Sequence, residues 1–299
     1  MKWLILGSSG QVGRELSRSL QSLGRGAALS RQQCDLAVAG EVAEAIARHE
    51  PDVVINAAAY TAVDRAEDEP QSAYRVNADA VEELARACAE RNVPLVHYST
   101  DYVYSGQGDK PFQEDDATGP LSVYGKSKLA GEQAIARAGA RALIFRTSWV
   151  YASHGSNFVK TMLRLGRERD DLSVIDDQIG APTWAATIAD VTALALYAWQ
   201  REQWSPSLAG VYHLTASGAT SWHGFAEAVF EEALALQLID RAEMPRVAPI
   251  PSADYPQKAP RPKNSRMDLA RLEQAFGLSM PDWRDALRSC LQYMKDGQQ

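Results

Sequence analysis

A tyrosine and a lysine, Tyr124 and Lys128, lie four residues apart in the stretch YGKSK. Residues at this spacing share one face of a helix, so a helix here would point both side chains the same way. Thr100 ends an earlier apolar run, PLVHYST. A hydroxyl, a phenol and an ammonium suit the reduction of a ketone, in which carbon receives a hydride and oxygen receives a proton. The alternative is an ordinary amphipathic turn, since many helices contain such a pair.

This chemistry sets a requirement for the lysine. Free tyrosine has a pKa of about 10, which is too high for efficient proton exchange near neutral pH. Lowering it by about three units requires roughly 4 kcal/mol, and one cation about 4 Å away at an effective dielectric constant near 20 supplies about that much. We therefore expect Lys128 to lower the pKa of Tyr124 and to hold the ribose hydroxyls of a nicotinamide. We expect Thr100 to donate a hydrogen bond to the substrate oxygen.

The elements that must position these residues follow an alternating pattern in the first half of the chain. Short apolar runs predict strands at 2–7, 27–30, 52–58, 94–100 and 142–150. Helical periodicity lies between them, at 11–23, 40–50, 69–91 and 121–138. This alternation predicts an α/β fold of the Rossmann type, a doubly wound parallel sheet that binds ligands beyond the carboxyl ends of its strands.

The second half of the chain is less regular. Helices are expected at 156–169, 187–202, 221–236 and 282–296, with short strands at 172–176 and 210–214. Six prolines between 244 and 264 predict an extended segment or loops. We expect residues 1–150 to form a dinucleotide-binding core to which later segments return. Residues 151–299 would mainly form a smaller substrate-binding lobe.

A glycine-rich stretch, GSSGQVG, joins the first predicted strand to the first helix. Gly7 allows the tight turn, Gly10 lets a pyrophosphate approach the backbone, and Gly13 lets the helix pack close to the strand. The helix N-terminus adds free N–H groups and partial positive charge for the phosphates. The stretch, including Gln11 and Val12, predicts a dinucleotide site, and a purely structural turn is the alternative.

The residues after the second strand bear on which dinucleotide binds. NAD sites commonly place an acidic residue there to bond the ribose hydroxyl, whereas this chain has Ser30 and Arg31. The guanidinium of Arg31 suits a 2′-phosphate, unless Arg31 is a solvated loop residue. We therefore expect NADPH, with NADH possible. Asp35 and Leu36 would flank the adenine.

Together these motifs resemble a known family. The glycine loop, NAAAYTAVDRAE (56–67), STDYVY (99–104) and YGKSK look like extended short-chain dehydrogenase/reductases that act on nucleotide sugars. More narrowly, GSSGQVGREL, STDYVYSG, YGKSKLAGE, LIFRTSWVY, DQIGAPT and RPKNSRMD resemble the dTDP-4-dehydrorhamnose reductase family over nearly the whole chain. This resemblance implies that NADPH reduces the C4 ketone of dTDP-4-dehydro-L-rhamnose. The product would be dTDP-L-rhamnose, a precursor for surface polysaccharide.

The resemblance also implies roles for individual residues. Tyr124 would be the proton donor, Lys128 its partner, and Thr100 the hydroxyl beside the carbonyl. Asp101 would contact the sugar, and Asn77 would hold a proton-relay water unless it is an ordinary polar residue.

Other implied roles concern the cofactor and the rest of the substrate. Trp149 would pack against the sugar or nucleotide, with a core position as the alternative, and Arg261 would clamp the diphosphate. The residues implied to line the cofactor are Ala57, Ala58, Ala59, Thr61 and Val63.

Related enzymes catalyse other reactions on the same scaffold. Sugar dehydratases that resemble this chain carry Asp-Glu after the threonine, whereas this chain has Asp101-Tyr102, so the second carboxylate is absent. Epimerases retain a tightly bound NAD, and Arg31 argues against this class because its guanidinium suits the 2′-phosphate of NADP. Two alternatives stay open: a reductase of another nucleotide-4-keto-sugar, and a non-catalytic NADP-binding regulatory subunit. A regulator need not keep Thr100, Tyr124 and Lys128 together.

Composition excludes several other classes. The net charge is −7 and no Lys/Arg-rich run occurs, which argues against a nucleic-acid partner. No stretch is apolar enough for a membrane span, and three cysteines without metal-like spacing suggest reduced thiols in the cytoplasm. We predict no metal site from the residues themselves. Mg²⁺, with Glu15 as a possible ligand, and a homodimer are expectations from the family alone, and a solvated Glu15 is preferred.

Overall fold

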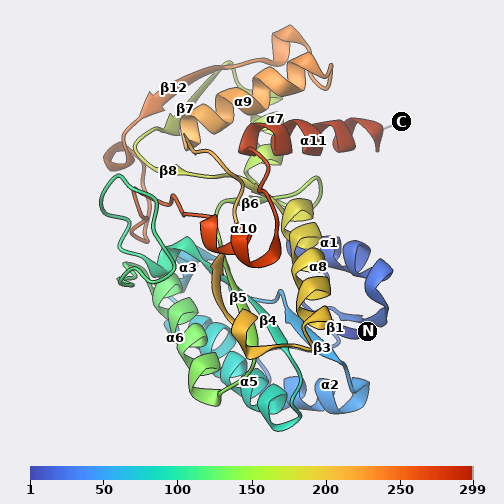
Figure 1. Ribbon diagram of the computed structural model, residues 1–299. Helices are drawn as coiled ribbons and strands as arrows, with labels where there is room; N and C mark the ends of the chain where they lie inside the picture. The colour runs from blue at the N-terminus through green and yellow to red at the C-terminus, as the bar shows by residue number, and fades with distance from the viewer. Residues whose placement is uncertain (298–299) are drawn as a thin grey trace.

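The central layer of the computed structural model, which describes residues 1–297, is a six-stranded parallel sheet (Figure 1). Its strand order is β10-β5-β4-β3-β1-β2. The strands are β1 (Lys2–Leu6), β2 (Arg25–Leu29), β3 (Val53–Asn56), β4 (Leu95–Thr100), β5 (Ala142–Thr147) and β10 (Gly210–His213). The direction of strand addition reverses between β1 and β3, and ligands of open α/β sheets bind at such a point. The predicted doubly wound fold is therefore confirmed.

Helices cover both faces of this sheet, which explains why its strands read as continuous apolar runs. Ile5 packs into a core shared with α1 (Gln11–Ser19) and α8 (Ala185–Arg201). Leu4 and Leu6 point to the opposite core. That core is closed by α2 (Glu41–His49), α5 (Ala80–Glu90) and α6 (Val123–Ala138). Figure 1 shows α1 and α8 on one side of the strands, and α5 and α6 on the other.

A separate core holds the lobe at the top of Figure 1. It is formed by α7 (Phe158–Glu168), α9 (Trp222–Ala235), α11 (Trp283–Asp296), β7 (Asp171–Ile175) and β12 (Arg246–Ile250). Phe225 and Phe230, both on α9, are almost completely buried there. The lobe therefore has its own apolar interior, distinct from the two layers around the sheet.

The proline-rich stretch is more ordered than its composition indicated. β12 lies within it and pairs in parallel with β7, with Pro249 opposite Val174. Proline is tolerated because this ladder has only two strands, so one side of each strand needs no partner. The sequence did not predict α10 (Ala270–Phe276), which follows the stretch. The remaining short elements are α3 (Val63–Ala66), α4 (Pro70–Tyr74), β6 (Val150–Tyr151), β8 (Ile179–Gly180), β9 (Thr183–Trp184) and β11 (Thr220–Ser221).

Two segments of the second half return to the sheet. α8 packs beside α1, and β10 adds a strand to the edge next to β5. The division at residue 150 stays a prediction. Across the described residues 1–297, none of the helices is long and apolar enough to cross a membrane.

Candidate active site

A cavity of about 780 Å³ lies beyond the carboxyl ends of β1, β3 and β4. Its walls come from the loops after β1, β2 and β3, from the end of β4, and from the first turns of α6. The predicted residues that line it are Gly7, Gly10, Gln11, Val12, Arg31, Asp35, Leu36, Ala57, Ala58, Ala59, Thr61, Tyr124 and Lys128. The structure thus brings the glycine loop and the Tyr124–Lys128 pair to one cavity.

The glycine loop is shaped by close backbone contacts. Gly7 has φ +81°, and a Cβ there would lie 2.7 Å from the Ala58 nitrogen. A Cβ on Gly13 would lie 2.1 Å from the Gly7 oxygen, so Gly13 supports the loop from beneath rather than lining the cavity. Gly10 is the N-cap of α1 and offers no side chain, which leaves the first N–H groups of that helix available to a phosphate.

Three polar atoms on the cavity wall fit a polar ligand. Gln11 Oε1, Arg75 Nη2 and Thr147 Oγ1 are buried and have no hydrogen-bond partner among residues 1–297. An unsatisfied buried polar group costs about 1–3 kcal/mol, so a ligand that supplies partners is favoured. Together with the glycine loop, these atoms fit a dinucleotide. Ser30 and Val63, predicted to touch the cofactor, lie outside the cavity wall.

Lys128 lies deep in the wall and is 2% exposed. Its Nζ donates a hydrogen bond to the Tyr98 carbonyl oxygen at 2.6 Å and lies 3.4 Å from His97 Nε2. Burial lowers the pKa of Lys128 to about 8, and the nearby Glu132 carboxylate opposes this decrease. The ammonium is therefore still mostly charged at neutral pH.

The expected effect of Lys128 on Tyr124 is wrong for this structure. Removal from bulk water raises the pKa of Tyr124 to about 12, and a polar contact with Thr100 only partly offsets that increase. The loss of hydration dominates because it disfavours the charged phenolate, and the negative charge of Asp101 raises the pKa further. Tyr124 is thus a neutral phenol at neutral pH, which is the form that a proton donor needs.

The Thr100 hydroxyl is directed differently from what we expected. It donates a hydrogen bond to Asp101 Oδ1 at 2.9 Å and accepts one from the Tyr102 N–H at 3.3 Å. A neighbouring carboxylate is a strong acceptor, so it captures the hydroxyl proton. In this state Thr100 does not present that proton to a substrate oxygen.

Asp101 is 3% exposed, and both of its oxygens are occupied. Ser265 donates a hydrogen bond to Oδ2 at 2.5 Å, and Thr100 bonds Oδ1. Burial raises the pKa of Asp101 to about 6, although these two hydrogen bonds act in the opposite direction. A direct contact of Asp101 with the sugar stays a prediction.

The helix expected at 69–91 is interrupted by a π-helical turn, Arg75–Asp79. Such turns often mark functional positions. Asn77 lies in this turn, and its side-chain oxygen accepts a hydrogen bond from the Tyr60 N–H. Its side-chain nitrogen donates to the Tyr60 carbonyl oxygen and to Ser127 Oγ, each at 3.0 Å. It therefore ties the loop after β3 to α6. Its proposed role in holding a water stays a prediction.

Arg75, which the sequence analysis missed, is placed in the cavity wall by the same turn. Its guanidinium is fixed by Glu83 at 2.8 Å and by the Ala37 carbonyl at 3.1 Å, while Nη2 is left without a partner in residues 1–297. Ala37 follows the pair expected to flank the adenine. Arg75 is therefore directed toward the end of the cavity where we expect the adenosine to bind.

We predict that Arg75→Met weakens binding of NADPH and NADH by about tenfold each, close to 1.4 kcal/mol. Removing the guanidinium removes the donor that a bound adenosine would satisfy. Titration calorimetry would measure both affinities, with Arg86→Met as the control because Arg86 forms an exposed pair with Glu82 on α5. Unchanged affinities in Arg75→Met would contradict this placement.

Trp149 and Arg261 both make contacts that the sequence did not indicate. Trp149 adopts a left-handed backbone (φ +49°), and its ring stacks on Trp222 with centroids 3.8 Å apart. Arg261 forms two hydrogen bonds with Asp64, at 2.9 and 2.6 Å, which hold the pKa of that carboxyl at about 2. The roles of Trp149 and Arg261 in binding substrate stay predictions.

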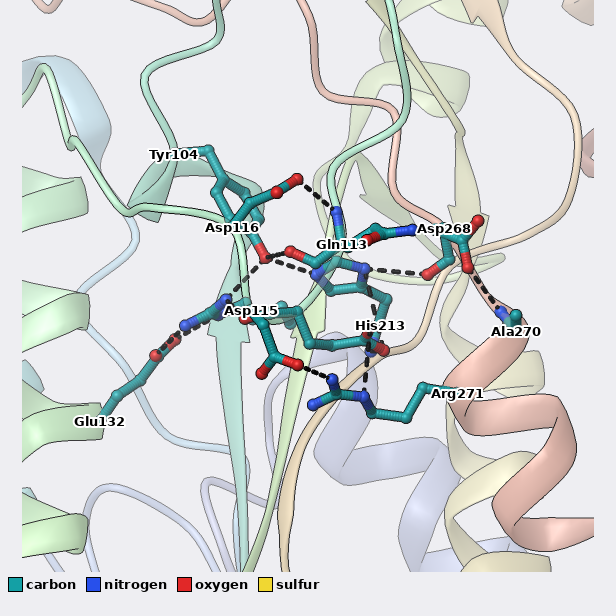
Figure 2. Close-up of polar contacts among 11 residues, drawn as sticks. Tyr104, Gln113, Asp115, Asp116, Glu132, His213, Asp268, Ala270 and Arg271 are labelled. Carbon is teal, nitrogen blue, oxygen red and sulfur yellow. Dashed lines mark hydrogen bonds and ion pairs between the residues drawn. The ribbon is translucent and has the colours of Figure 1, made fainter.

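A buried polar network supports the ends of β4 and β5 (Figure 2). Arg146 on β5 forms a two-pronged ion pair with Glu132 of α6, at 2.6 and 3.0 Å. Arg146 also donates to the Tyr104 hydroxyl at 2.6 Å, and that hydroxyl lies 2.6 Å from His213 Nε2. Ser99, on the cavity wall, donates to Glu132 as well. The network therefore reaches from the cavity to the last strand of the sheet.

The geometry fixes the tautomer of His213. Its Nδ1 lies 2.9 Å from the Asp268 carbonyl oxygen, which can only accept, so Nδ1 carries the proton. Nε2 is then the acceptor for the Tyr104 hydroxyl. Burial lowers the pKa of His213 to about 4, so the ring stays neutral and structural.

No group of three or more His, Cys, Asp or Glu side chains suited to a metal occurs within the described residues. Glu15 instead contacts Arg18 at 3.3 Å and His154 at 3.4 Å. The Mg²⁺ allowed by the family resemblance therefore receives no support from these contacts.

A glycine loop at the point where strand order reverses, facing a tyrosine and a buried lysine on one helix, is the arrangement of an extended short-chain dehydrogenase/reductase. The family model described as the RmlD substrate binding domain matches residues 1–295, and the chain belongs to this family.

Known relatives match this chain over nearly its full length. The chain is 48% identical over 295 residues to the dTDP-4-dehydrorhamnose reductase of Shigella flexneri, covering 97% of each chain. A crystal structure of a dTDP-4-dehydrorhamnose reductase from Clostridium acetobutylicum is 34% identical, with a TM-score of 0.89, and the match covers 99% of this chain and 100% of that one. The Bacillus anthracis dTDP-4-dehydrorhamnose reductase, solved in complex with NADP, is 33% identical with a TM-score of 0.87, covering 98% and 99%.

Proposed function

We propose that this protein is an oxidoreductase that reduces the C4 ketone of dTDP-4-dehydro-L-rhamnose with NADPH, giving dTDP-L-rhamnose as the last step of its biosynthesis. The observation that carries this proposal is that Tyr124 and Lys128 line the same cavity as the glycine loop. The names of the full-length relatives supply the substrate, and the NADP bound to the Bacillus anthracis enzyme supports the cofactor.

The residues of this chain would divide the work as follows. NADPH, when bound, supplies the hydride. The neutral phenol of Tyr124 donates its proton to the C4 oxygen. Lys128, positively charged and hydrogen-bonded to Tyr98, holds the ribose hydroxyls of the cofactor beside Tyr124.

We also propose how the two parts of the chain share the ligands. The sheet and its helices, mainly residues 1–150 with α8 and β10, bind the cofactor. The lobe of residues 151–299 binds the nucleotide sugar, with Trp149 and Arg261 at its border. Release of Arg261 from Asp64 would be needed before it could bind a diphosphate.

The test of this function is an assay of NADPH oxidation with dTDP-4-dehydro-L-rhamnose generated in situ. We expect oxidation that depends on the sugar and that is much slower with a 4-keto-sugar carried by another nucleotide. The protein could instead bind NADPH and oxidise it with none of the nucleotide sugars tested. That result would contradict the proposal and favour a regulatory subunit. Turnover only with another sugar would assign a different substrate.

Arg31 is expected to favour NADPH over NADH. Its guanidinium lies at the cavity wall, mostly exposed, and pairs with Asp35 at 3.1 Å. Arg31→Ala should weaken NADPH binding by about tenfold and leave NADH binding nearly unchanged, because only NADPH carries the 2′-phosphate. Titration calorimetry with both cofactors measures this ratio. Equal losses for the two cofactors would show that Arg31 does not read the 2′-phosphate.

A further inference from the structure

A threonine hydroxyl at the end of β5 has no hydrogen-bond partner in the protein. Thr147 is the last residue of this strand and is 8% exposed. Its Oγ1 is buried and makes no hydrogen bond within residues 1–297, although the residue belongs to the wall of the cavity. A buried hydroxyl without a partner is unfavourable, so a ligand in the cavity that supplies one would gain affinity.

The hydroxyls beside Thr147 do have partners in the protein. Ser99, on the neighbouring strand β4, donates to Glu132. Ser148, which follows Thr147 in the chain, donates to the Ala181 carbonyl oxygen at 3.1 Å. The end of β5 is therefore not a loosely bonded region, and the free hydroxyl of Thr147 is an exception that a bound ligand would explain.

The order of the strands shows which part of a dinucleotide would reach Thr147. β2 lies on one side of β1, and β3, β4 and β5 follow on the other side. A dinucleotide with its pyrophosphate on the glycine loop after β1 therefore extends in both directions along this edge of the sheet. Its adenosine would lie beyond β2, near Arg31, and its nicotinamide beyond β4 and β5. Thr147 lies at the second end of the cavity, as do Tyr124 and Lys128.

The side chains at this end suit the two parts of a nicotinamide differently. Val12 and Val150 line the cavity and pack against the apolar core, so they offer contact to the flat ring but no hydrogen bond. The carboxamide on the ring has one oxygen that accepts and an NH₂ group that donates. A threonine hydroxyl can both donate and accept, so it can bond either end of the carboxamide.

We propose that the Thr147 hydroxyl binds the carboxamide of the nicotinamide and thereby fixes the orientation of the ring. This inference rests on the proposed function. The ring can turn about its bond to the ribose, and a carboxamide held at Thr147 allows only one face of the ring to be turned toward Tyr124 and the sugar. Thr147 forms and breaks no covalent bond, and it contributes by holding the reacting groups in one arrangement.

The first experiment separates the nicotinamide from the rest of the cofactor. Thr147→Val keeps the branched shape and removes the hydroxyl, and titration calorimetry would measure its affinity for NADP⁺ and for 2′-phospho-ADP-ribose, which lacks the nicotinamide. We expect about fivefold weaker binding of NADP⁺, the effect of one neutral hydrogen bond, and unchanged binding of 2′-phospho-ADP-ribose. Thr147→Ser keeps a hydroxyl and should bind NADP⁺ nearly as the wild type does.

Two cofactor analogues then test the carboxamide itself. The 3-acetylpyridine analogue of NADP⁺ lacks the N–H donors, and the thionicotinamide analogue replaces the oxygen by sulfur, a weak acceptor. Thr147→Val should weaken one of these analogues less than it weakens NADP⁺, because that analogue has already lost the bond. Thr161→Val is the matched control, since Thr161 does not line the cavity and its hydroxyl donates to the Asn157 carbonyl oxygen at 2.9 Å. It should bind all four ligands as the wild type does.

Three outcomes would overturn the proposal. Unchanged NADP⁺ affinity in Thr147→Val would show that the hydroxyl makes no bond to the cofactor. An equal loss for 2′-phospho-ADP-ribose would show that the substitution disturbs the whole cavity. Losses with both analogues as large as with NADP⁺ would exclude the carboxamide as the partner.

If Thr147→Val does not fold, Thr147→Ala, which also lacks the hydroxyl, decides by the same comparisons. Failure of the proposed function is a separate result, because these affinities are measured without any sugar. In that case the wild type would turn over none of the nucleotide sugars tested, whatever the affinities show.

Discussion

Replacing Tyr124 by phenylalanine is expected to lower kcat by about 10²–10⁴-fold while NADPH still binds. The phenol is the proton donor to the C4 oxygen, and phenylalanine keeps the ring but lacks the O–H. The ring itself should stay in place, because it packs edge-on against Tyr102 with centroids 5.4 Å apart. Steady-state kinetics with the sugar and a separate titration with NADPH would measure the two quantities.

Tyr197→Phe is a suitable control, because Tyr197 is 48% exposed on α8 and does not line the cavity. It should keep the wild-type kcat. Near-normal turnover in Tyr124→Phe would mean that another group, or water, protonates the substrate. In that case the phenol would have only a packing role.

Breaking the buried ion pair of Arg146 and Glu132 should have the largest effect on stability. Glu132→Gln is expected to lower the free energy of unfolding by about 3–5 kcal/mol. Arg146 is 4% exposed and would be left as an uncompensated buried charge, while Ser99 and Tyr104 would lose an ordered partner. Urea denaturation followed by circular dichroism measures this change.

An exposed ion pair offers the comparison. Glu82 pairs with Arg86 on α5, where both side chains face solvent, so Glu82→Gln should change the free energy of unfolding by less than about 1 kcal/mol. If the two glutamine variants were equally stable, the network of Figure 2 would not stabilise the ends of β4 and β5 as argued.

The parts of the fold that the sequence predicted correctly depend on local patterns. β1, α1, β4 and α6 each combine a clear apolar period with a chemical signal at the end, such as the glycine loop or the Ser122 N-cap of α6. The proline-rich stretch was predicted less fully. Its composition indicated an extended segment or loops, but whether it pairs with another strand depends on β7, which lies far away in the sequence.

The parts of the site that lie in short sequence motifs were predicted correctly. Contacts between residues that are far apart in the sequence were not predicted. The Tyr124–Lys128 pair and most of the cofactor wall follow from spacing and resemblance. Asp101 and Ser265 are 164 residues apart, so their contact has no local signal. The pKa of Tyr124 was predicted in the wrong direction because the sequence does not show how far the folded chain removes this phenol from water.

The most direct test of the account follows the transferred hydrogen. The protein would be incubated with dTDP-4-dehydro-L-rhamnose and NADPH that carries deuterium at the transferred position of the nicotinamide. The two epimers of this deuterated cofactor would be used in separate reactions. Mass spectrometry and NMR would then examine the sugar nucleotide. We predict dTDP-L-rhamnose with one deuterium bonded to C4 from one epimer only. Recovery of unreduced sugar, or of a reduced sugar without deuterium at C4, would contradict the assignment of this chain as the C4 reductase.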